Sequence, residues 1–151
     1  MTQVDFHSGV DDKIGYACRL LRKAFRQGAR VRVVGAPEDV DLLDRALWTF
    51  DPHDFVPHLR WRAGAPLRPA LARTPLWLTS DVHDWPADVP PARVLVNLGL
   101  DAVDAVAPAY DRVIEIVSTD ADERRAGRLR WRAYEAAGHA PEHHPVGKDK
   151  E

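Results

Sequence analysis

The sequence has a single cysteine, Cys18, and no apolar run near the ~18 residues that a membrane-spanning helix needs. One cysteine excludes an internal disulfide and a metal site built from several thiolates. Cys18 lies in an apolar stretch with helical spacing, so we expect a buried and unreactive thiol. The first residues, MTQVDFHSGVDDK, lack the basic and apolar segments of a signal peptide, and a cytoplasmic protein without membrane contact is expected.

The chain also has no excess of positive charge. Lys and Arg number 21 and Asp and Glu number 23, which gives a formal net charge of −2. A protein with this balance is a poor general binder of nucleic acid, because such affinity comes mainly from neutralising phosphates. The content of 45% hydrophobic and 29% charged residues is typical of a globular fold, and 151 residues suit one domain.

The motifs of common enzyme classes are absent as well. The turn Gly35-Ala36-Pro37-Glu38 follows a predicted strand but lacks the glycine patterns that cradle a pyrophosphate. Neither a GxSxG nucleophile turn nor an HExxH zinc motif occurs. The sequence therefore predicts no cofactor, no metal ion and no catalytic residue.

Hydrophobic periodicity predicts alternating strands and helices. Strands are expected at 4–6, 30–35, 76–79, 92–98 and 112–117, helices at 14–26, 37–48 and 119–138, and a short helical turn at 103–107. Gly28 and Gly138 are the expected stop signals of the first and last helix, and Ser118 or Thr119 the expected cap of the last. This order indicates a Rossmann-like three-layer α/β/α fold with a mostly parallel sheet of about five strands, without a nucleotide-binding glycine loop.

We expect one α/β domain over residues 1–139. Proline-rich stretches predict long irregular loops at 49–74 and 81–91, and loops of such length in a compact domain are usually functional. Residues 140–151 are polar and are predicted to form a flexible tail.

An aromatic cluster occurs where the second helix runs into the first long loop, in LWTFDPHDFVPH (47–58). Within this cluster, Trp48 and Phe55 are the candidate residues for binding a partner. One interpretation is a small satellite core under the loop. The other is an exposed apolar patch for a protein partner, since aromatic residues supply much of the binding energy at interfaces.

Two further groups carry side chains suited to acid–base or metal chemistry. Pro52 favours a turn in which the neighbouring aspartates bond the backbone, rather than a site made of Asp51, His53 and Asp54. The tail histidines follow the predicted end of the last helix and are not expected to share a helix face, so we expect solvent exposure rather than a zinc site; they are His139, His143 and His144.

The last predicted helix has five arginines in the nine residues 124–132. Arg124, Arg128 and Trp131 are spaced i, i+4 and i+7 and share one face. Cationic groups beside a ring suit a peptide that carries carboxylates and an apolar side chain. The alternative is a solvated face whose arginines pair with Asp120, Asp122 and Glu123. A separate face is expected to pack on the sheet through Leu129, Ala133 and Ala136.

Three segments together resemble the chi subunit of bacterial DNA polymerase III holoenzyme. They are RALWTFDPHDFVPH (45–58), LVNL (95–98) and RLRWRAYEAAGH (128–139). The resemblance in element order and length covers nearly the whole chain, whereas 59–91 matches poorly. It implies a non-catalytic adaptor with a Rossmann-like fold that has lost the nucleotide loop.

The resemblance also implies partners and site residues. Members of this family bind the acidic C-terminal tail of the single-stranded-DNA-binding protein and pair with the psi subunit, which connects them to the clamp loader. The tail-binding positions correspond to Arg128, Trp131, Arg124 and Val117. Trp48 and Phe55 correspond to the aromatics that dock psi or, alternatively, a helicase or another replication or repair protein. DNA would be contacted only indirectly.

Two other functions remain open on the sequence alone. One is a degenerate Rossmann-like enzyme for a nucleotide or small molecule that uses Asp51, His53 and Asp54. The other is direct binding of single-stranded DNA by the arginine-rich helix, with Trp61, Trp131 and Tyr134 as stacking platforms. The missing glycine loop opposes the first, and the net charge opposes the second.

Overall fold

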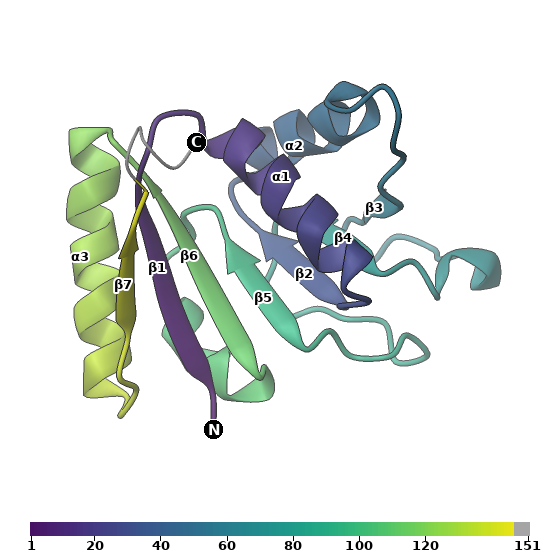
Figure 1. Ribbon diagram of the computed structural model, residues 1–151. Helices are drawn as coiled ribbons and strands as arrows, with labels where there is room; N and C mark the ends of the chain where they lie inside the picture. Colours follow the sequence, from purple (N-terminus) through teal and green to yellow (C-terminus); the bar gives the residue numbers. More distant parts are fainter. Residues whose placement is uncertain (147–151) are drawn as a thin grey trace.

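The computed structural model describes residues 1–146 and contains one seven-stranded sheet in which every pair of neighbours is parallel. The order is β3-β4-β2-β5-β6-β1-β7 (Figure 1). The strands are β1 Gln3–Val10, β2 Val31–Val34, β3 His58–Arg60, β4 Leu76–Thr79, β5 Val94–Asn97, β6 Arg112–Ser118 and β7 Glu142–Pro145. The strand β5 lies at the centre of the sheet, as the mostly apolar sequence at 92–98 predicts.

Helices α1 (Lys13–Arg26) and α2 (Pro37–Thr49) cover one face of the sheet. The Asp12 side chain caps α1 by accepting from the Gly15 N–H at 3.0 Å, and Pro37 opens α2 at a position where no N–H is needed. The apolar stripes of both helices bury a core against β2, β4, β5 and β6, and Cys18 lies inside it.

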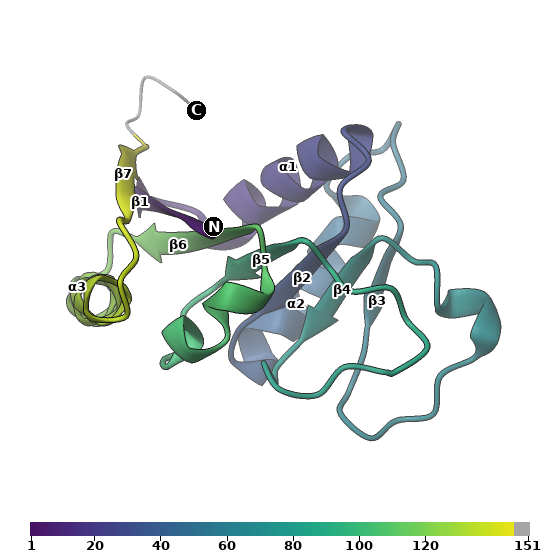
Figure 2. The same ribbon diagram turned by 90° about the horizontal axis from the view of Figure 1, so that it is seen from below.

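Helix α3 (Ala121–Ala136) lies on the opposite face, next to the 3-10 turns η2 (Val103–Ala105) and η3 (Ala107–Ala109). Figure 2 shows α1 and α3 on opposite sides of the sheet. The long loops, which include the 3-10 turn η1 (Pro69–Leu71), cover the rest of this face with a cluster around Trp61, Trp77 and Trp85. The three-layer α/β/α arrangement is therefore confirmed.

The number of strands and the start of α3 differ from expectation. The sheet has seven strands rather than five, because the short edge strands β3 and β7 escape detection by hydrophobic pattern. The cap of α3 is Asp120, whose carboxylate accepts from the backbone N–H groups of Asp122 and Glu123. Gly138 lies just beyond α3 with φ +92°, a left-handed conformation that favours glycine, as predicted for the stop.

The prediction of a flexible tail is wrong for Glu142–Pro145. These residues form β7 and pair in parallel with β1, in the register Asp5↔Glu142 to Ser8↔Pro145. Backbone pairing and the side-chain contacts Ser8–His143 and Asp5–His144 hold the strand, although it has no apolar pattern. Residues 147–151 of the expected tail lie outside the described residues.

None of the helices within residues 1–146 is long and apolar enough to cross a membrane.

Candidate functional site

A buried polar network fixes α3 on the sheet. Glu115 of β6 is fully buried and accepts hydrogen bonds from Asn97, Arg130 and Tyr134. The Arg130 Nε lies 3.0 Å from Oε1, and the Tyr134 hydroxyl lies 2.7 Å from Oε2. Burial raises the pKa of Glu115, while the Arg130 guanidinium and the donated hydrogen bonds act in the opposite direction. Burial beside this carboxyl also raises the pKa of Tyr134.

This network determines which face of α3 packs on the sheet, and that face differs from the predicted one. The buried positions of the helix are Gly127, Arg130 and Tyr134. Leu129, predicted to face the sheet with Ala133 and Ala136, is 64% exposed. The reason is that Arg130 and Tyr134, which are four residues apart on one face of α3, both donate hydrogen bonds to the buried Glu115 carboxylate of β6.

Beside the buried face, α3 borders a groove of about 550 Å³ that reaches β1, β6 and β7. Its apolar floor includes Phe6, Val117 and Trp131. The Trp131 ring is partly buried and packs on Phe6 with ring centroids 5.0 Å apart. One rim carries cationic side chains of α3, and the other carries the Ser8 hydroxyl and the His143 ring, which contact each other.

Gly127 explains how α3 comes close enough to form this groove. A Cβ at this position would lie 3.2 and 3.3 Å from the two methyl groups of Val117. The missing side chain therefore allows the helix to lie directly against β6 at the groove floor.

The groove brings together all four residues expected at a partner-tail site, namely Val117, Arg124, Arg128 and Trp131. The residues that β1 and β7 contribute to the groove were not predicted from the sequence; they are Phe6, Ser8 and His143. The alternation of β1 contained a signal for Phe6, whereas nothing in the sequence placed His143 beside it.

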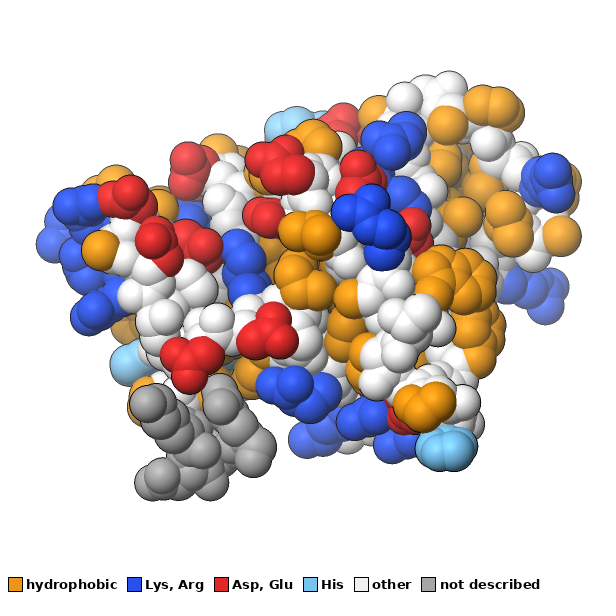
Figure 3. Space-filling model, turned by 90° about the horizontal axis from the view of Figure 1, so that it is seen from above, with side chains coloured by type: hydrophobic (Ala, Val, Ile, Leu, Met, Phe, Trp, Pro, Cys, Tyr) orange, Lys and Arg blue, Asp and Glu red, His pale blue; other side chains and the backbone are white. Residues whose placement is uncertain are grey.

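The acids near the start of α3 are engaged elsewhere. Asp120 caps the helix, Asp122 pairs with Arg125, and Glu123 pairs with Lys13 at 3.1 Å. Within residues 1–146, no carboxylate lies within 4 Å of the charged groups of Arg124, Arg128 or Arg132. Figure 3 views the molecule toward the C-terminal ends of the strands, and basic side chains gather at its left margin, over α3. The groove is lined by these three arginines and one carboxylate, Glu135, so it offers a net positive charge to an anionic ligand.

A second surface feature lies at the end of α2. Trp48 and Phe55 are 59% and 55% exposed, and their ring centroids are 5.3 Å apart. The buried ring of His58 lies edge-on to Trp48 with ring centroids 4.9 Å apart, and its Nε2 lies 3.2 Å from the Asp44 carboxylate. These contacts favour an exposed patch over a satellite core. We call Trp48 and Phe55 the aromatic patch.

Ion pairs and a backbone hydrogen bond hold the loop 50–54, which connects the two residues of the aromatic patch. Asp51 accepts from Arg22 at 2.7 Å and from the backbone N–H of His53 at 2.9 Å, and Asp54 accepts from Arg26 at 2.5 Å. These hydrogen bonds hold a turn, as Pro52 predicts, so both aspartates serve structure.

The stacking platforms expected for single-stranded DNA do not share a surface. Trp61 and Tyr134 are buried in different clusters, and only Trp131 lines the groove. The tail histidines are also separated, because His143 borders the groove while His144 contacts Asp5.

Comparison with known proteins gives consistent results. The model of the family described as "DNA polymerase III chi subunit, HolC" matches residues 1–142. The chain is 32% identical to "DNA polymerase III subunit chi" of Pseudomonas aeruginosa, over 95% of this chain and 96% of the relative. It is 28% identical to the protein of the same name from Escherichia coli (strain K12), over 91% of this chain and 86% of the relative.

Proposed function

The chain belongs to the DNA polymerase III chi-subunit family, and we propose that it links the clamp loader to single-stranded-DNA-binding protein as a non-catalytic, cytoplasmic adaptor. In this proposal the groove along α3 grips the acidic C-terminal tail of the single-stranded-DNA-binding protein. The observation that carries it is that Val117, Arg124, Arg128 and Trp131 line one groove, whose cationic rim has no carboxylate partner within residues 1–146.

The chemistry of the groove suits the end of an acidic peptide. The terminal carboxylate binds Arg128, whose planar guanidinium can donate two parallel hydrogen bonds. An apolar terminal side chain packs on Trp131 and Val117, and preceding acidic residues lie near Arg124. Such contacts typically reach micromolar affinity, about −8 kcal/mol, and become effective when several tails are presented on one partner.

Calorimetric titration with a synthetic acidic peptide that ends in phenylalanine tests this proposal. Arg128→Ala is expected to weaken binding by about 1.5–3 kcal/mol, the cost of removing a charge-assisted hydrogen bond. Arg125→Ala is the matched control, because Arg125 lies on the same helix, pairs with Asp122 and does not line the groove. Unchanged affinity of Arg128→Ala, or equal losses in both variants, would refute the site.

The same titration can identify the group that Arg128 binds. A peptide with an amidated C-terminus lacks the carboxylate and is expected to bind the unmodified protein as weakly as Arg128→Ala binds the acid. For the Arg128→Ala variant, amidation of the peptide should reduce the affinity little further, because the substitution and the amidation remove the same interaction. Additive losses would mean that Arg128 contacts another part of the peptide.

The aromatic patch is proposed as a separate docking surface for psi or for another replication or repair protein. Capture from a cell lysate with Trp48→Ala, Phe55→Ala and Arg128→Ala is expected to lose two different partners. Leu129→Ala is the control, since Leu129 is an exposed apolar residue outside both surfaces. If a patch variant and Arg128→Ala lost the same partner, the two surfaces would not be independent.

A further inference from the structure

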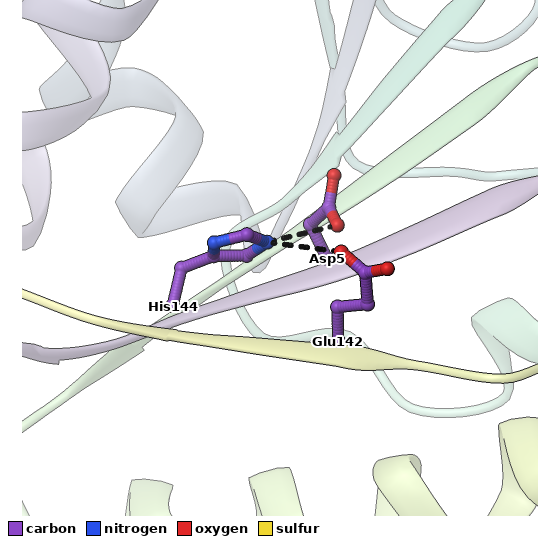
Figure 4. Close-up of side chains that lie close together, drawn as sticks. All are labelled: Asp5, Glu142 and His144. Carbon is purple, nitrogen blue, oxygen red and sulfur yellow. Dashed lines mark hydrogen bonds and ion pairs between the residues drawn. The ribbon is translucent and has the colours of Figure 1, made fainter.

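A cluster of possible metal ligands lies where β7 meets β1, on the side of the sheet away from α3. Asp5 comes from β1, and Glu142 and His144 come from β7 (Figure 4). The register pairs Asp5 with Glu142, and both lie on the same side of the sheet as His144 two residues further on. One ligand atom of each residue lies within 4.8 Å of the other two.

The buried carboxylate of Asp5 is held in a fixed orientation. Its Oδ2 accepts from the Arg112 Nε at 2.8 Å, and the Gln3 amide lies 3.1–3.2 Å from its two oxygens. Its Oδ1 lies 3.1 Å from the His144 Nε2. One oxygen is thus used by the guanidinium, while the other points toward the two side chains of β7.

The spacing of these atoms is that of ligands around one small ion. The His144 Nε2 lies 3.1 Å from Asp5 Oδ1 and 3.7 Å from Glu142 Oε2. Ligands of a tetrahedral zinc ion, bound at about 2.0–2.1 Å, lie about 3.4 Å apart. The two observed separations fall on either side of this value.

We propose that Asp5, Glu142 and His144 form a binding site for a zinc ion. Two carboxylates and one imidazole are ligands that zinc accepts, and three protein ligands leave a fourth position for water. Asp5, Glu142 and Arg112 together carry a formal net charge of −1, which favours a dication. The ion would tie β7 to β1 through side chains of both strands.

This proposal is independent of peptide binding, although β7 also carries His143 at the groove. Because ligand binding to the native state stabilises it, zinc is expected to raise the free energy of unfolding. Peptide titration in the presence of a chelator tests the groove alone, so failure of one proposal leaves the other intact.

The experiment measures zinc binding to the full chain by calorimetry and cobalt binding by its visible absorption. His144→Gln and Glu142→Gln are expected to weaken zinc binding by at least ~10-fold, because changing even a residue that only supports a metal ligand typically costs that much. His143→Gln is the matched control, because His143 is the next residue of β7 and faces the groove. Asp5 is left unchanged, since its other hydrogen bonds contribute to folding.

Support requires zinc binding by the unmodified chain, tetrahedral cobalt absorption, selective loss in His144→Gln and Glu142→Gln, and unchanged affinity in His143→Gln. Absence of binding would identify the cluster as an ion pair between strands and overturn the proposal. Equal losses in all three variants would show that zinc binding does not depend on this cluster in particular and would also overturn the proposal, as would full affinity in His144→Gln.

Discussion

Replacing Arg130 with methionine tests the network that holds α3. Methionine keeps much of the apolar stem but removes the cation that lies 3.0 Å from the buried Glu115 carboxylate. Breaking a buried ion pair from one side typically costs about 3–5 kcal/mol, because the remaining charge is neither paired nor hydrated. The expected result is a loss of that size in the free energy of unfolding, measured by urea denaturation with tryptophan fluorescence and circular dichroism.

The control is Arg125→Met on the same helix. Arg125 is 64% exposed in its pair with Asp122, and exposed pairs contribute about 0–1 kcal/mol. The double variant Glu115→Gln/Arg130→Met is expected to be more stable than Arg130→Met alone, because the unpaired charge is gone. If Arg130→Met lost no more stability than Arg125→Met, the network would not be what fixes α3.

Three further predictions concern the groove and the core. Gly127→Ala should raise the free energy of unfolding by well under the ~1 kcal/mol that alanine contributes in an exposed helix, because its Cβ would press on Val117, and it should weaken binding of the acidic peptide. The full gain in stability with unchanged peptide affinity would contradict the close approach of α3 to β6. Peptide binding should weaken toward ~1 M salt, where the Debye length falls to about 3 Å, and calorimetry showing no salt dependence would instead indicate a purely apolar groove. Burial raises the pKa of Cys18 to about 11, so a thiol reagent at pH 8 should label it only after unfolding, whereas fast labelling of the native chain would place it at the surface.

The sequence predicted the central elements because their apolar patterns match the period of a strand or helix. The apolar residues of α1 recur at helical spacing. The three residues of β5 before Asn97 are all apolar, because helices, turns and loops cover both faces of the sheet at its centre. Strand β7 has no such pattern, since all four residues from Glu142 to Pro145 are exposed. Its position depends on backbone pairing with a strand more than 130 residues earlier, which local periodicity does not contain.

The cationic side of the groove was predictable for a similar reason. Spacing alone brings Arg124, Arg128 and Trp131 to one face of a helix. The identity of the buried face was not predictable in this way, because apolar Leu129 is exposed and charged Arg130 is buried. A single acidic residue within the apolar strand at 112–117 was the available indication that α3 would need a cation on its inner side.

The arginines of α3 therefore lie in two different environments, which their number does not distinguish. At 100° per residue, Arg130 lies about 160° around the helix from Arg128, so one side chain points into the fold while the other borders the groove. A variant that removed both charges would lose peptide affinity even if Arg128 did not contact the peptide, because α3 would also lose the Arg130–Glu115 pair that holds it on the sheet. Only substitutions restricted to Arg124 and Arg128, with the Glu115–Arg130 pair intact, separate recognition from folding.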